Sequence, residues 1–206
     1  LGTQPDQESA WSDERKNEIY RTFEAVVAKA RELNVDFLLI AGNLFDHQPA
    51  EEELEWLDGI LGQLGHTEVI YAAGFCDHLG GDATLLTYRF RSRVYVVGSP
   101  GLERTAGEVA SGIRDARATM AVDHLHFPDR NVDIYGVSFF DRRMDARVVD
   151  DAEPLDRDVR RLLVACGGDR RRMPIDWNRL KCSDFEYIAL GGHQKYQMKV
   201  PGKGYY

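Results

Sequence analysis

Hydrophobic positions near the start of the chain follow first a helical pattern and then a strand-like one. The helical set consists of Ile19, Phe23, Val26, Val27 and Ala30. Its spacing predicts a helix that ends near Leu33, with Ser12 as N-cap and acidic residues in its first turn. The apolar run at 35–41 then predicts a fully buried strand of a parallel sheet.

A second helix and a second strand follow in the same order. Pro49 fits the first position of a helix, and Glu51 to Glu53 favour its start. The apolar face of this helix consists of Leu54, Leu57, Ile60, Leu61 and Leu64. Residues 68–73 predict the next strand. Alternation of strand and helix is typical of βαβ units with right-handed crossovers.

The rest of the chain predicts a second sheet. Its expected strands cover 93–97, 131–138, 162–165 and 187–190. The weakly patterned stretch 101–121 is helix or loop, and a short helix is expected near Trp177. The predicted fold class is α/β, with two mixed sheets packed face to face and helices outside.

Composition narrows the class of protein without identifying a function. The chain has 206 residues, of which 43% are hydrophobic and 10% aromatic, and these values are typical of a globular protein. A net charge of −8 provides no overall basic field for nucleic acid. Three widely spaced cysteines indicate a reducing compartment. No apolar run reaches the length of about 18 residues that suggests a membrane span, so we expect a cytoplasmic protein without a membrane partner.

The strand expected at 35–41 ends in the motif Gly42-Asn-Leu-Phe-Asp46, at the edge where open α/β sheets place their chemistry. This motif resembles the second motif of the calcineurin-like metallophosphoesterases, which reads Gly-Asp-Leu-Phe-Asp in the SbcD-type DNA-repair nucleases. The resemblance implies a single domain over residues 1–206 with a four-layer α-β-β-α sandwich. It also implies two divalent metal ions, manganese or similar. Residues 1–206 are expected to lack two parts of the family's structure. These are the first strand with its Asp-x-His motif and a C-terminal capping domain.

In that family the first aspartate of the motif bridges both metal ions. Two divalent cations held roughly 3.5–4 Å apart repel each other and need such a shared negative charge. The residue at this position is Asn43, which is neutral. Its amide oxygen could coordinate one ion, or the side chain could cap or brace the turn after the strand.

A second family motif, Gly-Asn-His-Asp, matches Gly74-Phe-Cys-Asp77. The resemblance implies that Phe75 replaces a metal-binding asparagine and that Cys76 replaces the histidine that assists the leaving group. A phenyl ring cannot bind the metal. Cys76 could be a soft ligand, a nucleophile or a small core residue, and Asp77 could stabilise the turn. His78 could replace the missing histidine through a shift of register.

Two further motifs complete the resemblance. The segment Leu162-Leu-Val-Ala-Cys166 resembles a strand that ends in a metal-binding histidine, and Cys166 occupies that position, where a thiolate could bind zinc. The family's Gly-His-x-His pair falls on Gly192 and Gln194, with His193 between them. Neighbours on an extended segment point to opposite sides, so His193 is expected to face away from the site.

At the positions of residues 1–206 that correspond to the family's metal ligands, this chain therefore has other residue types. The residues around those positions match the family motifs. These positions are Asn43, Phe75, Cys166, Gly192 and Gln194. We expect a metal-free, catalytically inactive homologue that needs no cofactor and acts as a binding or assembly module. Its expected partner is an SbcC-like ATPase or another protein subunit. Nucleic acid is a further candidate that the charge does not support.

An alternative is an active metal-dependent phosphodiesterase or nuclease with a rearranged ligand set. Its ligands would be drawn from Asn43, Cys76, His78, Cys166 and His193. The thiols in this set would favour zinc over manganese.

Two groups of arginines have two possible roles. Arg89, Arg91 and Arg93 alternate near two aromatic residues, and Arg170 to Arg172 form a short cluster. Each group is either a phosphate-contacting edge or a solvated surface. No dinucleotide fingerprint, Walker A loop, nucleophile elbow or Cys-x-x-Cys pair is present in the sequence.

Overall fold

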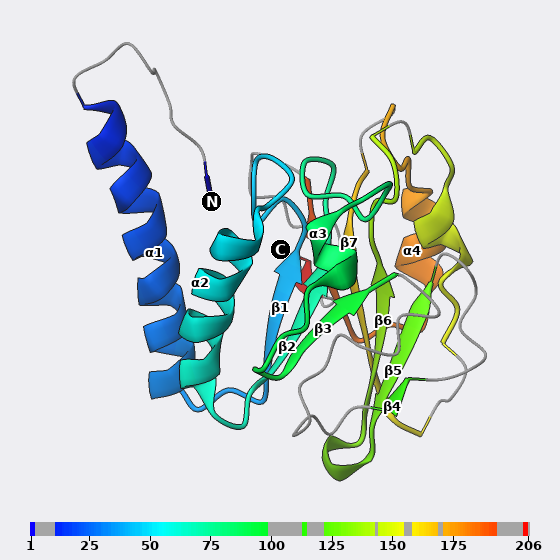
Figure 1. Ribbon diagram of the computed structural model, residues 1–206. Helices are drawn as coiled ribbons and strands as arrows, with labels where there is room; N and C mark the ends of the chain where they lie inside the picture. Colours follow the sequence, from blue (N-terminus) through cyan, green and yellow to red (C-terminus); the bar gives the residue numbers. More distant parts are fainter. Residues whose placement is uncertain are drawn as a thin grey trace.

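Two β-sheets lie side by side at the centre of the molecule (Figure 1). The computed structural model describes residues 1–2, 11–98, 113–114, 122–142, 144–154, 158–168, 171–192 and 204–205. The first sheet has the order β1-β2-β3, with β1 at Phe37–Ala41, β2 at Glu68–Ala72 and β3 at Val94–Val97. Its strands are all parallel, and the register pairs Phe37 with Glu68 and Val69 with Val94.

The second sheet is mixed and has the order β4-β5-β6-β7-β8-β9. Its strands are β4 (Ile113–Arg114), β5 (Asp123–Phe127), β6 (Val132–Val137), β7 (Arg160–Cys166), β8 (Tyr187–Gly191) and β9 (Gly204–Tyr205). β5 is antiparallel to β4 and β6, whereas β6, β7, β8 and β9 run parallel to one another. The α/β class and the presence of two sheets are therefore confirmed.

The helices are attached to these sheets by hydrophobic packing. They are α1 (Ser12–Glu32), α2 (Glu51–Leu61), α3 (Thr84–Thr87) and α4 (Trp177–Cys182). The 3-10 turns are η1 (Gly62–Leu64), η2 (Pro128–Arg130) and η3 (Val148–Asp151). In Figure 1, α1 and α2 lie beside the first sheet, and α4 lies beside the second.

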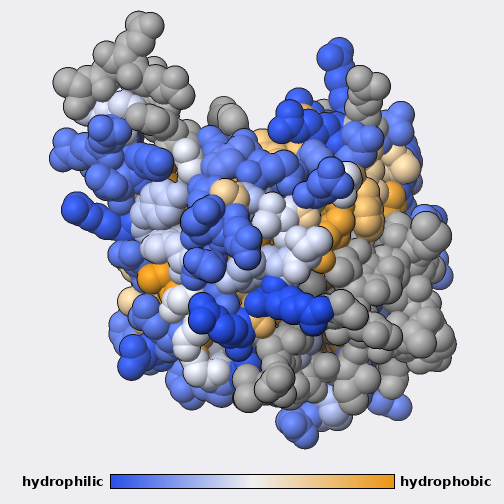
Figure 2. Space-filling view, in the orientation of Figure 1, coloured by the Kyte–Doolittle hydropathy of each residue, from blue (hydrophilic) through white to orange (hydrophobic). Residues whose placement is uncertain are grey.

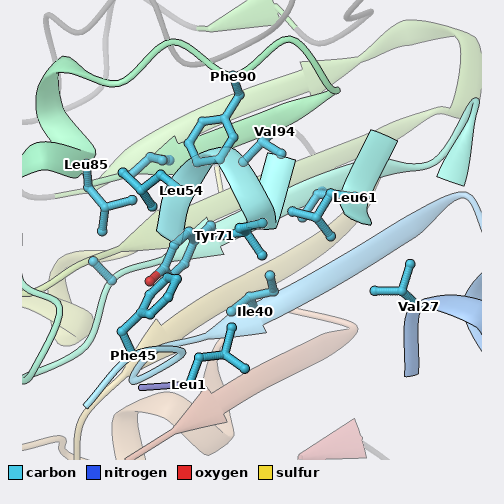
Figure 3. Packing of buried hydrophobic residues seen from close by; sticks show 14 of the residues in the cluster. Leu1, Val27, Ile40, Phe45, Leu54, Leu61, Tyr71, Leu85, Phe90 and Val94 are labelled. Atoms are coloured by element: carbon cyan, nitrogen blue, oxygen red, sulfur yellow. The ribbon is translucent and has the colours of Figure 1, made fainter. Parts of the chain in front are cut away.

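Three groups of buried hydrophobic residues hold the elements together. The first joins α1 and α2 to the first sheet and includes Leu54 and Tyr71 (Figure 3). The second contains residues of both sheets, such as Ile70 and Val164. The third joins the second sheet to α4 and includes Leu180. Each sheet thus buries apolar side chains on both of its faces.

The starts of the two long helices differ from the sequence-based expectation. α1 begins at Ser12, which is buried in the first turn, and its N-cap is Trp11 without a side-chain hydrogen bond. α2 has Ala50 as its N-cap, so Pro49 precedes the helix and does not occupy its first position. The preference of serine for the N-cap position is weak, and tertiary packing can override it. At Ser12 the side chain packs inward and does not cap the helix.

The buried face of α1 is narrower than its hydrophobic pattern suggested. Val27 and Ala30 are buried, but Val26 is 48% exposed and Leu33 is 62% exposed. A helix that packs on one layer buries only a stripe of its surface, and Val26 lies beside that stripe.

β1 is not fully buried, so this prediction was wrong. Only Ile40 is buried among its residues, and the other four are partly exposed. Among the described strands β1 pairs only with β2, but edge position alone does not account for its exposure, because β3 lies at the other edge of the sheet and is buried throughout. An apolar run of this length does not distinguish an edge strand from a central one.

The assignment of strands to sheets also needs correction. The strand expected at 93–97 belongs to the first sheet, where β3 is parallel to β2, and this sheet is not mixed. The chain between β2 and β3 contains only the short α3, so no helical pattern marked the crossover. β5 was not predicted, although His124 and His126 alternate there with apolar residues. The stretch 101–121 lies outside the described residues, apart from 113–114 in β4.

Glycines allow the two sheets to approach closely near one end. A Cβ atom added to Gly191, at the end of β8, would lie 1.5 Å from the Ala41 carbonyl oxygen at the end of β1. One added to Gly136 in β6 would lie 2.2 Å from the Val97 side chain in β3. Backbone hydrogen bonds reinforce this contact, since the Phe139 N–H donates to the Ala73 carbonyl oxygen over 2.9 Å. The strand ends of both sheets are therefore held together.

Hydrophilic side chains cover most of the described surface in the view of Figure 2. Within the described ranges, no helix has the length and apolar character needed to cross a membrane. The cytoplasmic location expected from the sequence stays a prediction.

A buried carboxylate ties α2 to the start of β3. Asp58 is 3% exposed and accepts hydrogen bonds from the backbone N–H groups of Arg91 and Ser92, each over 2.9 Å. The Ser92 hydroxyl and the Arg91 side chain also donate to it. Burial alone would raise the pKa of Asp58, but these hydrogen bonds outweigh it and hold the pKa below its usual value.

We expect Asp58→Asn to lower the free energy of unfolding by about 2 kcal/mol at neutral pH, because the amide group turns a donor toward donors. Since the folded pKa is depressed, the contribution of the carboxylate is fully present above the unfolded pKa of about 4 and is lost below it. Urea denaturation at a series of pH values should therefore show the difference between the two proteins shrinking below about pH 4. A difference that stays constant down to acid pH would contradict this account.

Candidate functional site at the strand ends

The turns that follow β1, β2, β7 and β8 meet at one place. A Cβ atom added to Gly42, after β1, would lie 2.3 Å from the Cβ of Cys166 at the end of β7. One added to Gly74, after β2, would lie 2.3 Å from the backbone nitrogen of Asn43. One added to Gly192, after β8, would lie 3.2 Å from the Cys166 sulfur. Four segments that are distant in sequence thus converge on one site.

Asn43 connects two of the turns that form this site. Its backbone has a positive φ of 48°, which asparagine tolerates better than most residues. Its side-chain Oδ1 accepts a hydrogen bond from the Cys76 N–H over 2.9 Å, so the amide connects the turn after β1 with the turn after β2. Of the two roles considered for Asn43, the structure shows the bracing one. An ion at this oxygen would have to displace or share that hydrogen bond.

Asp77 is the structural centre of the turn after β2. Its carboxylate is fully buried and accepts hydrogen bonds from the Gly74 N–H over 2.6 Å, the Phe45 N–H over 3.1 Å and the Tyr71 hydroxyl over 2.5 Å. Figure 3 shows Tyr71 with its hydroxyl directed toward Phe45. Burial, and then the charge of Asp77, raise the pKa of Tyr71 well above its usual value, so this hydroxyl remains a donor. The turn-stabilising role considered for Asp77 is confirmed.

Phe75, which stands where the resembled family has a metal-binding asparagine, contacts two arginines. The guanidinium carbon of Arg172 lies 3.6 Å from the centre of its ring, and that of Arg142 lies 6.0 Å away. Phe139 forms an edge contact with the same ring at 6.3 Å. Sequence reasoning treated Arg172 only as part of a basic cluster and missed Arg142, because nothing in the local pattern links that residue to Phe75.

The two thiols of the site differ in accessibility. Cys166 is 1% exposed, and burial followed by the charge of Asp77 raises its pKa to about 12. Cys76 is partly exposed, and burial and then Asp77 also raise its pKa, while Arg142 and Arg172 act in the opposite direction. Both thiols are thus poor sources of thiolate at neutral pH.

Thiol reactivity provides a direct check of this environment. At pH 8 we expect the exposed Cys182 to react with a disulfide reagent first, Cys76 more slowly, and Cys166 about a thousandfold more slowly than a free thiol. Mass spectrometry after timed labelling would assign each site. Cys182→Ser should remove the fast phase only, and labelling of native Cys166 at the rate of Cys182 would refute the buried assignment.

Of the two histidines considered as replacement ligands, only His78 lies within the described residues. The Nδ1 of His78 accepts a hydrogen bond from the Gly80 N–H over 3.2 Å, so this nitrogen belongs to the local loop. His193 and Gln194 lie outside the described residues. The sequence did not single out His47, which lies between two carboxylates. Its Nδ1 is 2.6 Å from Asp46 Oδ1, and its Nε2 is 2.8 Å from Glu53 Oε2. Asp46 first, and then Glu53, raise the pKa of His47 against the effect of burial.

The donor set does not fit a pair of divalent cations. The amide oxygen of Asn43 already accepts a hydrogen bond, the Phe75 ring has no donor atom, and the Cys166 thiol is held protonated. Gly192 has no side chain. In the part of the chain that the structure describes, no group of three or more His, Cys, Asp and Glu residues is placed to hold a metal ion. In comparisons with known proteins, neither a family model nor a curated protein matches the chain.

Proposed function

We propose that the chain is a calcineurin-like metallophosphoesterase domain, related to the SbcD-type nucleases, that binds or assembles with a partner and does not hydrolyse phosphoesters. The proposed architecture is the four-layer α-β-β-α sandwich. Three separate hydrophobic groups support it, because one lies between the sheets and each of the others joins a sheet to helices. The motif Gly42-Asn-Leu-Phe-Asp46 stands at the strand ends, where this architecture would place its chemistry.

The observation that carries the functional proposal is the contrast between the frame of the site and its donor positions. The frame is intact, since Asp77 holds the turn after β2 and the strand ends meet closely. The donor positions instead hold a neutral amide, a phenyl ring, a protonated thiol and a glycine. Two-metal hydrolysis needs anionic or imidazole ligands around both ions. A binding or assembly role makes no such demand, and an SbcC-like ATPase or another protein subunit remains the proposed partner.

The alternative of an active enzyme requires side chains to change their present partners. Cys166 would have to lose its proton in a buried environment, and His78 would have to leave its contact with the Gly80 N–H. The described residues offer no observation that favours this rearrangement over the non-catalytic role.

Metal content and turnover test the proposal together. The purified protein, incubated with Mn²⁺ or Zn²⁺ and then desalted, should contain metal well below one equivalent by elemental analysis. It should not hydrolyse bis-p-nitrophenyl phosphate with either ion. Cys166→Ser serves as the matched variant, because the active alternative requires it to lose metal and activity together. Stoichiometric metal with turnover would overturn the proposal, and loss of both in Cys166→Ser would assign them to the rearranged ligand set.

A further inference from the structure

Two arginines from separate loops converge on one aromatic ring at the strand ends. Arg142 follows β6 and Arg172 follows β7, and both guanidinium carbons lie within 6.0 Å of the centre of the Phe75 ring. At 3.6 Å, Arg172 is in van der Waals contact with the ring face. We call Arg142, Phe75 and Arg172 the arginine–phenylalanine cluster.

Backbone hydrogen bonds hold the two arginine loops in place. The Met173 N–H donates to the Met144 carbonyl oxygen over 2.8 Å, which ties the loop of Arg172 to the loop of Arg142. The Gly168 N–H donates to the Met173 carbonyl oxygen over 2.8 Å, which ties the same loop to the end of β7. Met173 is fully buried. The cations therefore project from anchored backbone and not from a free segment.

Both arginines are exposed, and among the described residues neither guanidinium group pairs with a carboxylate. Within the described ranges, these guanidinium groups contact the Phe75 ring, and both act to lower the pKa of the neighbouring Cys76 thiol. The nearest structural anion of the turn, Asp77, is fully engaged by three donors. Exposed arginines elsewhere differ in this respect: Arg15 and Arg179 have carboxylate partners, whereas Arg21 has none among the described residues.

We propose that the arginine–phenylalanine cluster binds a phosphate ester without a metal ion. A guanidinium group that stacks on an aromatic ring keeps its N–H donors in the plane of the group, where they can reach an oxyanion. Two such groups can contact different oxygens of one phosphate, and charge-assisted bonds of this kind are strong and directional. The exposed face of the stacked Arg172 offers a surface for a nucleobase, so the expected ligand is a nucleotide, free or at the end of a strand.

This inference rests on the proposed non-catalytic function, because it assigns to the site a binding role in place of hydrolysis. It differs from that proposal in naming the ligand and the groups that hold it. The overall charge of −8 means that no net positive field attracts anions to the protein as a whole, so binding would have to come from a local group of cations.

Isothermal titration calorimetry with EDTA present would test the cluster directly. The probes are inorganic phosphate, AMP, and an eight-residue oligothymidylate with and without a 5′-phosphate, with acetate as the carboxylate control. We expect phosphate-bearing probes to bind, and Arg142→Gln or Arg172→Gln to weaken binding about tenfold each. Arg172→Lys should weaken binding as well, because an ammonium group does not stack flat or form a fork. Arg21→Gln on α1 carries the same change of charge and should bind as the parent does.

The outcomes separate the two proposals. Binding that survives both glutamine substitutions, or that acetate reproduces, would overturn the cluster even if the protein is free of metal and inactive. Metal-dependent turnover together with arginine-dependent binding in EDTA would instead overturn the proposed function and leave the cluster in place. A preference for AMP over the phosphorylated strand would identify a free nucleotide as the ligand, and the reverse would identify a strand end. Unfolding midpoints in urea verify that each variant is folded before its binding is compared.

Discussion

Asp77→Ala is expected to lower the free energy of unfolding by about 3–5 kcal/mol, since it leaves three buried donors without an acceptor. Those donors are the Gly74 N–H, the Phe45 N–H and the Tyr71 hydroxyl, and water does not reach the fully buried tyrosine. Asp77→Asn should cost less, because the amide oxygen still accepts while its NH₂ group opposes a donor. Tyr71→Phe removes one of the donors and should cost about 1–2 kcal/mol.

Urea denaturation followed by tryptophan fluorescence would measure this series. Asp82→Ala is the matched control, because Asp82 is an exposed aspartate in the turn before α3, and its loss should change stability by less than about 0.5 kcal/mol. If Asp77→Ala were as stable as the control, the hydrogen bonds at Asp77 would not support the fold. If Tyr71→Phe cost as much as Asp77→Ala, the hydroxyl would be the dominant partner.

Gly191→Ala is expected to destabilise the protein by about 3 kcal/mol or more, because its new methyl group would overlap a backbone atom. The added Cβ would lie 1.5 Å from the Ala41 carbonyl oxygen, so β8 and β1 would have to move apart. Such a shift would propagate to the meeting point of the strand ends, where Gly192 and Cys166 are close neighbours. Thermal and urea denaturation would measure the loss, and labelling of Cys166 would report whether the strand ends open.

Gly59→Ala provides a control of opposite sign. Gly59 lies inside α2, is exposed, and has no atom within 4 Å of an added Cβ. Alanine there should raise the free energy of unfolding by about 0.5–1 kcal/mol through its better helix propensity. Equal effects of the two substitutions would show that the contact at Gly191 does not limit the approach of the sheets.

Patterns within one element predicted most of the architecture. The spacing of Leu54, Leu57 and Leu61 identified the buried face of α2, and each is buried in the structure. The apolar runs identified β2, β7 and β8 to within one or two residues. The short helix near Trp177 is present as α4. In each case the signal lies in the local periodicity of side chains that face one core.

Relations between elements were harder to predict, because local periodicity does not encode them. Nothing in residues 93–97 distinguishes a third strand of the first sheet from a strand of the second, since both are short and apolar. The edge position of β1 depends on which strands pair with it, and a run of apolar residues does not specify that. The convergence of Arg142 and Arg172 on Phe75 has the same origin, because three turns that are distant in sequence create it.

The location of the candidate site was predicted more successfully than the roles of its side chains. Asn43, Cys166 and Gly192 were placed together only through a resemblance to a family, and the structure brings their turns into contact. The role of Asn43 as a brace and that of Asp77 as a turn anchor were both among the readings that the sequence left open. The hydrogen-bond partners of these side chains come from other segments, so only the folded chain could reveal them.

Structural support and surface chemistry reside on different side chains in the turn after β2. Asp77 holds this turn from its buried side, whereas Phe75 and Cys76 are partly exposed. Substitutions at these two positions leave the acceptor of the three buried donors in place. The turn can therefore acquire new side chains over evolutionary time without loss of its backbone shape. It also offers protein engineers two adjacent positions where a new binding specificity can be selected while the supporting carboxylate is kept.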